Sequence, residues 1–498
     1  MAELRDWLGE ISDLRRAAAV LQWDKQTMMP RRGADSRSEQ LATLERITHE
    51  RFISARTGEL IEAAEAERGE GPPDSIDARI VSEARRLFDK SRRVPADLAA
   101  ARTRAAADGY RIWVRARESD DFAAFAPALA RNFQLTREYV ACFDDQEHPY
   151  DVVLDDFAPG MRTAEVTRLL GEMREALVPL IDQLAPRPVD RSPLHGHYGV
   201  EDQRRLVARV LHWMGFSDSG WRLDDTVHPF EQSFSVNDIR LTTRYVESYF
   251  PTALYAAMHE CGHGLYEAGV APELQRTPLG TIRSSAIHES QSRLWENMVG
   301  RSRAFCAALT PLLAEHARGG LDGLAPEALF RAVNTVQPST IRIEADETTY
   351  GLHIVVRFEL ELALLSGALD VADLPEAWNA KMSQYLGVEV ASHDEGVMQD
   401  VHWSEALVGY FPAYAIGNLI AGQLWARIRR DIVDLDEQLR RGDLRTLREW
   451  LREQVHRHGS RYSDAELLRR VVGEPVQVGP FIAYLRDKLA DVYQLELA

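Results

Sequence analysis

Apolar residues recur three and four positions apart along most of this chain, with charged residues between them. That spacing places the apolar side chains on one face of an α-helix. The segments 35–50 and 77–92 are clear examples, and the same pattern dominates residues 300–386 and the chain after residue 416. We therefore predict a mainly α fold.

Residues 228–245 (HPFEQSFSVNDIRLTTRY) depart from the helical pattern, because polar and apolar residues alternate there. Alternation is typical of a strand with one buried face, and Asn237-Asp238 is a suitable turn. We expect a short hairpin or a three-stranded sheet just before the next helix. Such a sheet could form one wall of a cleft, and its exposed edge could hold an extended peptide by main-chain hydrogen bonds.

The segment 251–269 (PTALYAAMHECGHGLYEAG) is predicted to be one helix, since a proline suits its first position and a glycine its end. It contains an H-E-x-x-H pattern. His259 and His263 are four residues apart, so both imidazoles point from the same face and can bind one Zn²⁺ ion. Glu260 lies at the flank of that face, where its carboxylate can accept a proton from a metal-activated water. The alternative interpretation is a chance match with ordinary core or surface histidines.

A catalytic zinc site needs a third protein ligand, and the candidates downstream are glutamates. Glu267 is too close to His263 on the same helix to turn back easily, and Glu273 lies in a loop. Glu289 lies in a new helix that can pack against the first, and Glu296 follows about two turns later. The spacing favours Glu289 over Glu296 only modestly.

Composition restricts the partners and the compartment. The net charge of −18 argues against binding to nucleic acid or to an anionic membrane surface. The 3 cysteines are too few for a disulfide framework and fit a reducing compartment. The first residues contain no apolar signal core, and no run is long enough to span a bilayer. We expect a cytoplasmic protein with neither a nucleic-acid nor a membrane partner.

Two further segments concentrate polar side chains. Residues 341–346 place Arg342 among carboxylates, and residues 396–403 combine Gln, Asp and His with a Trp. Tyr410 and Tyr414 follow closely, and phenols can donate hydrogen bonds to an oxyanion. The alternative for the two tyrosines is packing against the core at the start of a helix.

Together these motifs resemble the carboxypeptidase Taq family of metallocarboxypeptidases. The resemblance extends over most of the C-terminal half and includes the Trp23-Asp24 to Pro30 stretch near the N-terminus. The motifs that carry it, in order, are His228-Pro229-Phe230, Asp238-x-Arg240-x-Thr242, His259-Glu260-x-x-His263, His288-Glu289-Ser290-Gln291, Ile341-Arg342-x-x-Ala345-Asp346 and Gly396-x-x-Gln399-Asp400-x-His402-Trp403.

The resemblance implies a large helical metallopeptidase fold with a deep substrate groove and a small β-sheet beside the active site. It implies His259, His263 and Glu289 as metal ligands and Glu260 as general base. It further implies removal of C-terminal residues from peptide substrates with broad specificity and poor activity after proline. Members use one Zn²⁺ per subunit, or Co²⁺, and are commonly homodimers.

An enzyme that removes C-terminal residues must also bind the free carboxylate of its substrate. Arginine does this with two parallel hydrogen bonds, and Arg342 is our first choice, with Arg240 second. A structural salt bridge is the alternative for both. For the oxyanion donor we favour Tyr410 or Tyr414, with His228 as the alternative.

We expect residues 1–220 to form one helical wall of the groove and residues 221–498 to carry the metal site, within one catalytic unit. Two other functions are compatible with the same motifs. One is an endopeptidase or oligopeptidase on this fold, which would not need an arginine for the carboxylate. The other is a non-catalytic peptide-binding metalloprotein, although Glu260 would then have no purpose and a structural site would usually have a fourth protein ligand.

Overall fold

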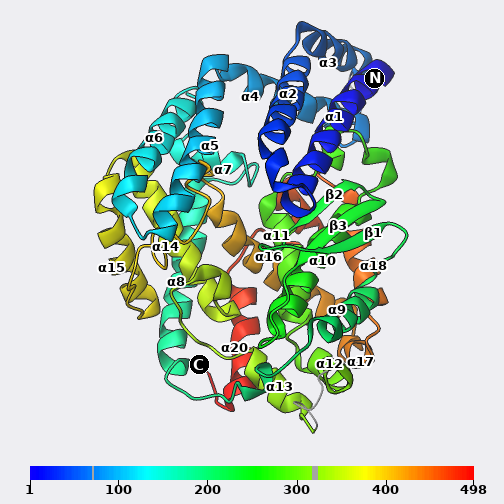
Figure 1. Ribbon diagram of the computed structural model, residues 1–498. Helices are drawn as coiled ribbons and strands as arrows, with labels where there is room; N and C mark the ends of the chain where they lie inside the picture. The colour runs from blue at the N-terminus through cyan, green and yellow to red at the C-terminus, as the bar shows by residue number, and fades with distance from the viewer. Residues whose placement is uncertain (70–71, 317–322, 498) are drawn as a thin grey trace.

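The computed structural model describes residues 1–69, 72–316 and 323–497. Helices account for 68% of the described residues and strands for 4%, which confirms the prediction of a mainly α fold (Figure 1). The segments 35–50, 77–92 and 251–269 all lie in helices, as their apolar spacing predicts. A capping box formed by Ser463 and Glu466 begins the helix Asp464–Val471.

The first half of the chain is helical up to the sheet. Its helices are α1 (Ala2–Thr27), α2 (Ala34–Phe52), α3 (Ala55–Arg68), α4 (Ile76–Arg93), α5 (Ala96–Glu118), α6 (Phe122–Val140), α7 (Pro149–Asp155), α8 (Thr163–Leu184) and α9 (Val200–Met214).

The second half continues in the same way after the sheet. Its helices are α10 (Pro251–Gly269), α11 (Ser285–Arg293), the π-helix η5 (Leu294–Val299), α12 (Arg303–His316), α13 (Pro326–Val333), α14 (Glu347–Ser366), α15 (Leu374–Leu386), α16 (Phe411–Asp431), α17 (Leu435–Arg440), α18 (Arg445–Gln454), α19 (Asp464–Val471) and α20 (Gly479–Tyr493).

The sheet has the strand order β1-β3-β2, with β1 at Trp221–Asp225, β2 at Glu231–Ser235 and β3 at Asp238–Thr243. Strands β2 and β3 pair antiparallel, as the predicted hairpin requires, and β1 pairs parallel with β3. The sheet packs against α10, because Ile239 and Leu241 turn inward from β3 and are fully buried. The predicted sheet is therefore present, and its third strand is β1.

Two hydrophobic cores lie on either side of α4. A small core joins α1, α3 and α4 to residues 270–279, whereas the large core gathers residues from α5 to the C-terminal helix. Helix α4 turns Ile80, Ala84 and Phe88 toward the small core, whereas Arg86 and Lys90 reach the other part of the molecule.

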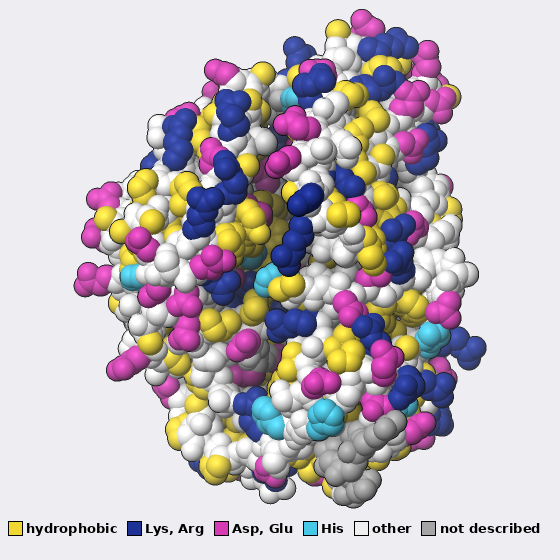
Figure 2. Space-filling model, in the orientation of Figure 1, with side chains coloured by type: hydrophobic (Ala, Val, Ile, Leu, Met, Phe, Trp, Pro, Cys, Tyr) yellow, Lys and Arg dark blue, Asp and Glu magenta, His cyan; other side chains and the backbone are white. Residues whose placement is uncertain are grey.

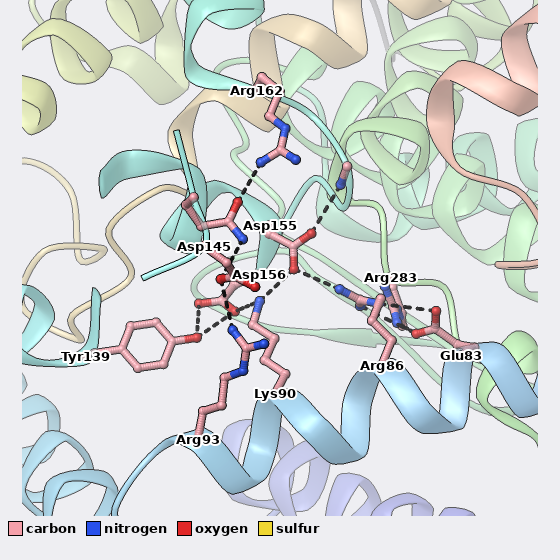
Figure 3. Close-up of polar contacts among 12 residues, drawn as sticks. Glu83, Arg86, Lys90, Arg93, Tyr139, Asp145, Asp155, Asp156, Arg162 and Arg283 are labelled. Carbon is pink, nitrogen blue, oxygen red and sulfur yellow. Dashed lines mark hydrogen bonds and ion pairs between the residues drawn. The ribbon is translucent and has the colours of Figure 1, made fainter. Parts of the chain in front are cut away.

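Those charged side chains tie α4 to the large core. Arg86 and Lys90 contact Asp155 Oδ2 at 2.8 and 2.7 Å, and Glu83 pairs with both Arg86 and Arg283 (Figure 3). We call Glu83, Arg86, Lys90, Asp155 and Arg283 the α4 ion-pair cluster. It joins α4 to the end of α7 and to the segment before α11. The two cores are therefore connected by ion pairs as well as by the covalent chain.

The face shown in Figure 2 is hollowed along its middle, between the side that carries α5 and the side that carries α1 and α2. Helices α10, α11 and α16 occupy the middle of the same view (Figure 1). The predicted division at residue 220 stays a prediction. Within the described residues, no helix is both long enough and apolar enough to cross a membrane.

Candidate metal centre

Helix α10 presents two different faces. Leu254, Met258 and Cys261 are fully buried on one of them. The imidazoles of His259 and His263 lie on the other, with ring centroids 4.9 Å apart. The core therefore fixes the rotation of α10, and that rotation turns both histidines toward α11.

Close helix packing brings α11 to these histidines. A Cβ atom at Gly262 of α10 would lie 2.7 Å from the Cα of Ser292 in α11, so only glycine fits there. On the other side of α11, a Cβ atom at Gly417 of α16 would lie 2.8 Å from the Cβ of Glu289. Three helices thus meet at van der Waals distance, and Glu289 is held between them with 5% of its surface exposed.

The side chains of His259, His263 and Glu289 converge. Glu289 Oε2 lies 3.8 Å from His259 Nε2 and 3.6 Å from His263 Nε2. The candidate ligand atoms of the three residues all lie within 4.8 Å of one another. Two imidazole nitrogens and one carboxylate oxygen are a suitable donor set for a catalytic divalent ion such as Zn²⁺. The residues present therefore fit the metal that the sequence motifs imply.

Glu289 and Glu296, between which the spacing left a choice, occupy different positions. Glu296 lies on the opposite side of the His259 ring, with Oε2 2.9 Å from Nδ1. Glu267 lies 3.4 Å from His288 Nε2, and Glu273 lies in a short 3₁₀ turn after α10. Of the glutamates considered, Glu289 is the one whose carboxylate reaches both histidines.

Glu260 is buried beside this centre, with 7% of its surface exposed. Burial raises the pKa of its carboxyl to about 7; the charge of Glu289 acts in the same direction, and His259 opposes it. A carboxyl group with a pKa near neutrality can both accept and return a proton at physiological pH.

Tyr410 and Tyr414 lie on the α16 side of the centre, with ring centroids 5.2 Å apart. Burial and the nearby charge of Glu289 raise the pKa of Tyr410 to about 12, and burial also raises the pKa of Tyr414 well above its ordinary value. Tyr414 is fixed by His402, whose Nε2 lies 3.2 Å from the phenol oxygen. Both phenols are therefore protonated hydrogen-bond donors at neutral pH.

Both arginines proposed for the substrate carboxylate have acidic partners. Arg342 is 6% exposed, and its Nε and Nη2 donate to Asp400 Oδ1 while Nη1 donates to the Tyr350 hydroxyl. Arg240 donates from Nε and Nη2 to Asp238, on the same strand. The Arg342 guanidinium lies 4.9 Å from the Tyr414 ring centroid, whereas that of Arg240 lies 4.9 Å from the Trp23 ring centroid.

His228 is exposed in the loop between β1 and β2. Partial burial and the charges of Arg244 and Arg117 lower its pKa. Within the described part of the chain, neither His228 nor Arg240 makes a hydrogen bond or ion pair with a residue of the centre.

Comparison with known proteins agrees with this geometry. A family model described as carboxypeptidase Taq (M32) metallopeptidase matches residues 3–489. The chain belongs to this family.

Curated relatives match over nearly the whole length. The chain is 40% identical to thermostable carboxypeptidase 1 of Thermus thermophilus, covering 98% of each chain. It is 34% identical to carboxypeptidase 1 of Bacillus subtilis, covering 99% of this chain and 98% of that one. The crystal structure of the M32 carboxypeptidase from Deinococcus radiodurans R1 superimposes with a TM-score of 0.96 at 37% identity, covering 99% of both chains. The protein is a metallocarboxypeptidase, a hydrolase that acts on peptide bonds.

Two basic residues of this M32 chain were missed by sequence reasoning. Arg293 donates to Glu289, and Arg301 holds Glu296 through a contact of 3.0 Å. The spacing of four between Glu289 and Arg293 was a usable signal, because residues four apart meet on a helix. The pairing of Glu296 with Arg301 had no such signal, since the turn between them is not α-helical.

Proposed function

We propose that this chain removes C-terminal residues from peptides with one divalent ion held by His259, His263 and Glu289. The ion would be Zn²⁺, with Co²⁺ as the alternative. The observation that carries the proposal is the convergence of these side chains beside the buried Glu260. When bound, the ion would supply Lewis-acid activation of a water molecule and of the scissile carbonyl.

Glu260 would move the proton in this reaction. Its carboxylate would accept a proton from the attacking water and then deliver it to the nitrogen of the departing amino acid. The raised pKa of its carboxyl, about 7, suits both transfers. Tyr410 or Tyr414 would donate a hydrogen bond to the developing oxyanion, because both phenols stay protonated, and His228 is the third candidate.

Arg342 is our first choice to bind the free carboxylate of the substrate, and Arg240 is the second. Both guanidinium groups would have to share their hydrogen bonds between a resident aspartate and the substrate. We favour Arg342, because its side chain is already buried and fixed near Tyr414. It would therefore lose little conformational entropy when the substrate binds.

The family resemblance also motivates broad specificity, poor cleavage after proline and a homodimer, and we include these in the proposal. The cysteine usage motivates a cytoplasmic location. The rival functions, an endopeptidase and a non-catalytic binding protein, have no specific observation in their favour.

The deciding experiment is digestion of paired peptides, one with a free C-terminus and one amidated. Zn²⁺-loaded wild type, Glu260→Gln and a control variant of the exposed Glu376, Glu376→Gln, are compared by mass spectrometry. Successive single-residue losses from the free peptide alone, absent in Glu260→Gln and retained in the control, are expected. Internal cuts in both peptides would replace the proposal with an endopeptidase. No cleavage by loaded wild type would favour a binding protein.

A further inference from the structure

The two oxygens of the Glu289 carboxylate face different neighbours. Its Oε1 accepts a hydrogen bond of 2.7 Å from Arg293 Nε, and its Oε2 faces His259 and His263. Arg293 is itself held in place, since its guanidinium lies 4.1 Å from the Tyr350 ring centroid. Because Arg293 occupies one oxygen, Glu289 offers only the other to the point where the histidines converge.

The two nitrogens of the His259 ring also face different neighbours. Its Nδ1 lies 2.9 Å from Glu296 Oε2, and its Nε2 faces Glu289. The Glu296 carboxylate is held by Arg301 at 3.0 Å and by Arg293 at 3.4 Å. A carboxylate oxygen of a glutamate paired with two arginines accepts a hydrogen bond from Nδ1, so the ring proton lies there and Nε2 is left as an acceptor.

A π-helical turn makes this division possible. Residues Leu294–Val299 form η5, in which Gly300 N donates to Trp295 O, five residues back. In an uninterrupted α-helix, Glu289 and Glu296 would lie on one face, seven residues and about two turns apart. The wider turn alters that register, so the two carboxylates approach His259 from different sides.

We propose that Arg293 and Glu296 are paired positioning residues for the metal centre. Arg293 makes Glu289 a one-oxygen ligand, and Glu296 fixes the tautomer and orientation of His259. This inference rests on the proposed function, since it assumes that the centre binds a divalent ion. Two histidines and one carboxylate oxygen leave a fourth position open to water or substrate, as a catalytic zinc site requires. A second oxygen of Glu289 would fill that position.

The test uses Co²⁺, whose visible absorption weakens when the coordination number rises above four. Glu296→Gln, Arg293→Lys and Arg293→Met are loaded with Co²⁺ without substrate, and the dissociation constant is measured by competition with a chelator. We expect Glu296→Gln to bind Co²⁺ about 10 to 100-fold more weakly. We expect both Arg293 variants to show weaker absorption bands, because Glu289 is freed to use both oxygens.

Controls separate positioning from folding. The exposed Glu376→Gln should bind Co²⁺ as the wild type does, and circular dichroism checks that each variant is folded. If Arg293→Met fails to fold, Arg293→Lys decides, since it keeps the charge and loses the planar fork. A purely structural role would lower the thermal midpoint without changing the dissociation constant or the spectrum, and that result would overturn the inference. Failure of the wild type to bind Co²⁺ would instead overturn the proposed function.

Discussion

Two groups of charged residues in this protein have similar composition and opposite roles. Each combines acidic and basic side chains, the first from one continuous segment, residues 289–301, and the second from segments far apart in the chain. One includes the proposed ligand Glu289, and we call it the metal-centre cluster: Glu289, Arg293, Glu296 and Arg301. The other is the α4 ion-pair cluster of Figure 3. They differ in which oxygen atoms are left without a donor.

Both carboxylate oxygens of Asp155, in the α4 ion-pair cluster, are saturated with hydrogen-bond donors. Its Oδ2 accepts from Arg86 and Lys90, and its Oδ1 accepts from the backbone nitrogen of Gly160. Glu289 of the metal-centre cluster gives one oxygen to Arg293 and keeps the other directed at the histidines. A carboxylate whose oxygens are all neutralised connects helices, whereas one with a spared oxygen can bind a cation.

Burial separates the two clusters further. The side chains of Arg86 and Asp155 are 36% and 29% exposed, whereas those of Glu289 and Arg293 are 6% and 13% exposed. Water and salt weaken pairs of the first kind. Removing one partner from a buried pair leaves an uncompensated charge, which is far more costly.

The largest expected effect comes from replacing the Glu289 oxygen that faces the two histidines. Glu289→Gln keeps an acceptor for Arg293 but replaces the second oxygen, or its charge, at the ligand position. We expect Zn²⁺ affinity and kcat/KM to fall by more than about 100-fold, because loss of a direct ligand exceeds loss of an outer hydrogen bond. Equilibrium dialysis and peptide hydrolysis measure both. Near-normal Zn²⁺ binding in this variant would show that Glu289 is not a ligand.

Much of the centre could be predicted from sequence because its signals are local. The spacing of four in α10 places His259 and His263 on one face, and the apolar residues Leu254, Met258 and Cys261 determine which face is buried. Gly262 belongs to the same short motif, and its missing side chain admits α11. Local periodicity therefore predicts most of the helices and two of the proposed metal ligands.

The remaining features depend on contacts between distant segments. Strand β1 pairs parallel with β3, and a parallel partner has no turn signal in the sequence. The choice between Glu289 and Glu296 depends on the π-helical turn, because an ideal helix would give both the same face. Arg342 and Asp400 come together from segments 58 residues apart, so their pairing could not be foreseen from spacing.

A smaller effect is expected from the α4 ion-pair cluster. Lys90 and Arg86 hold the pKa of Asp155 below its ordinary value although burial would raise it. Asp155→Asn removes that charge, and we expect a loss of stability of about 2 kcal/mol, since the site is only partly exposed. For a chain of this size, that corresponds to a fall of about 2 °C in the thermal midpoint. Differential scanning calorimetry measures the change, and kcat/KM should stay within about twofold because Asp155 is no ligand.

The matched control for Asp155 is an exposed ion pair. Glu172 contacts Arg168 at 2.8 Å, and both side chains are about half exposed, at 47% and 53%. Glu172→Gln should change stability by less than about 0.5 kcal/mol. Equal effects of the two variants would show that the α4 ion-pair cluster connects the two cores no more strongly than an ordinary surface pair.

The smallest effect concerns Asp464, which is buried near the α4 ion-pair cluster. The nearby positive charge does not offset the cost of burying its carboxylate. Burial raises its pKa to about 6, while a hydrogen bond of 2.7 Å from Ser284 Oγ and the charge of Arg283 oppose the rise. The folded state therefore binds the proton more tightly than the unfolded state does. The stability from the protonated form is complete below pH about 4 and is lost as the pH rises through 6. Asp464→Asn keeps an acceptor for Ser284 and stays neutral. The difference between its thermal midpoint and that of the wild type should therefore increase by about 1 °C as the pH rises from 4.5 to 7.5. A constant difference over that range would show that Asp464 is ionised throughout, like the saturated Asp155.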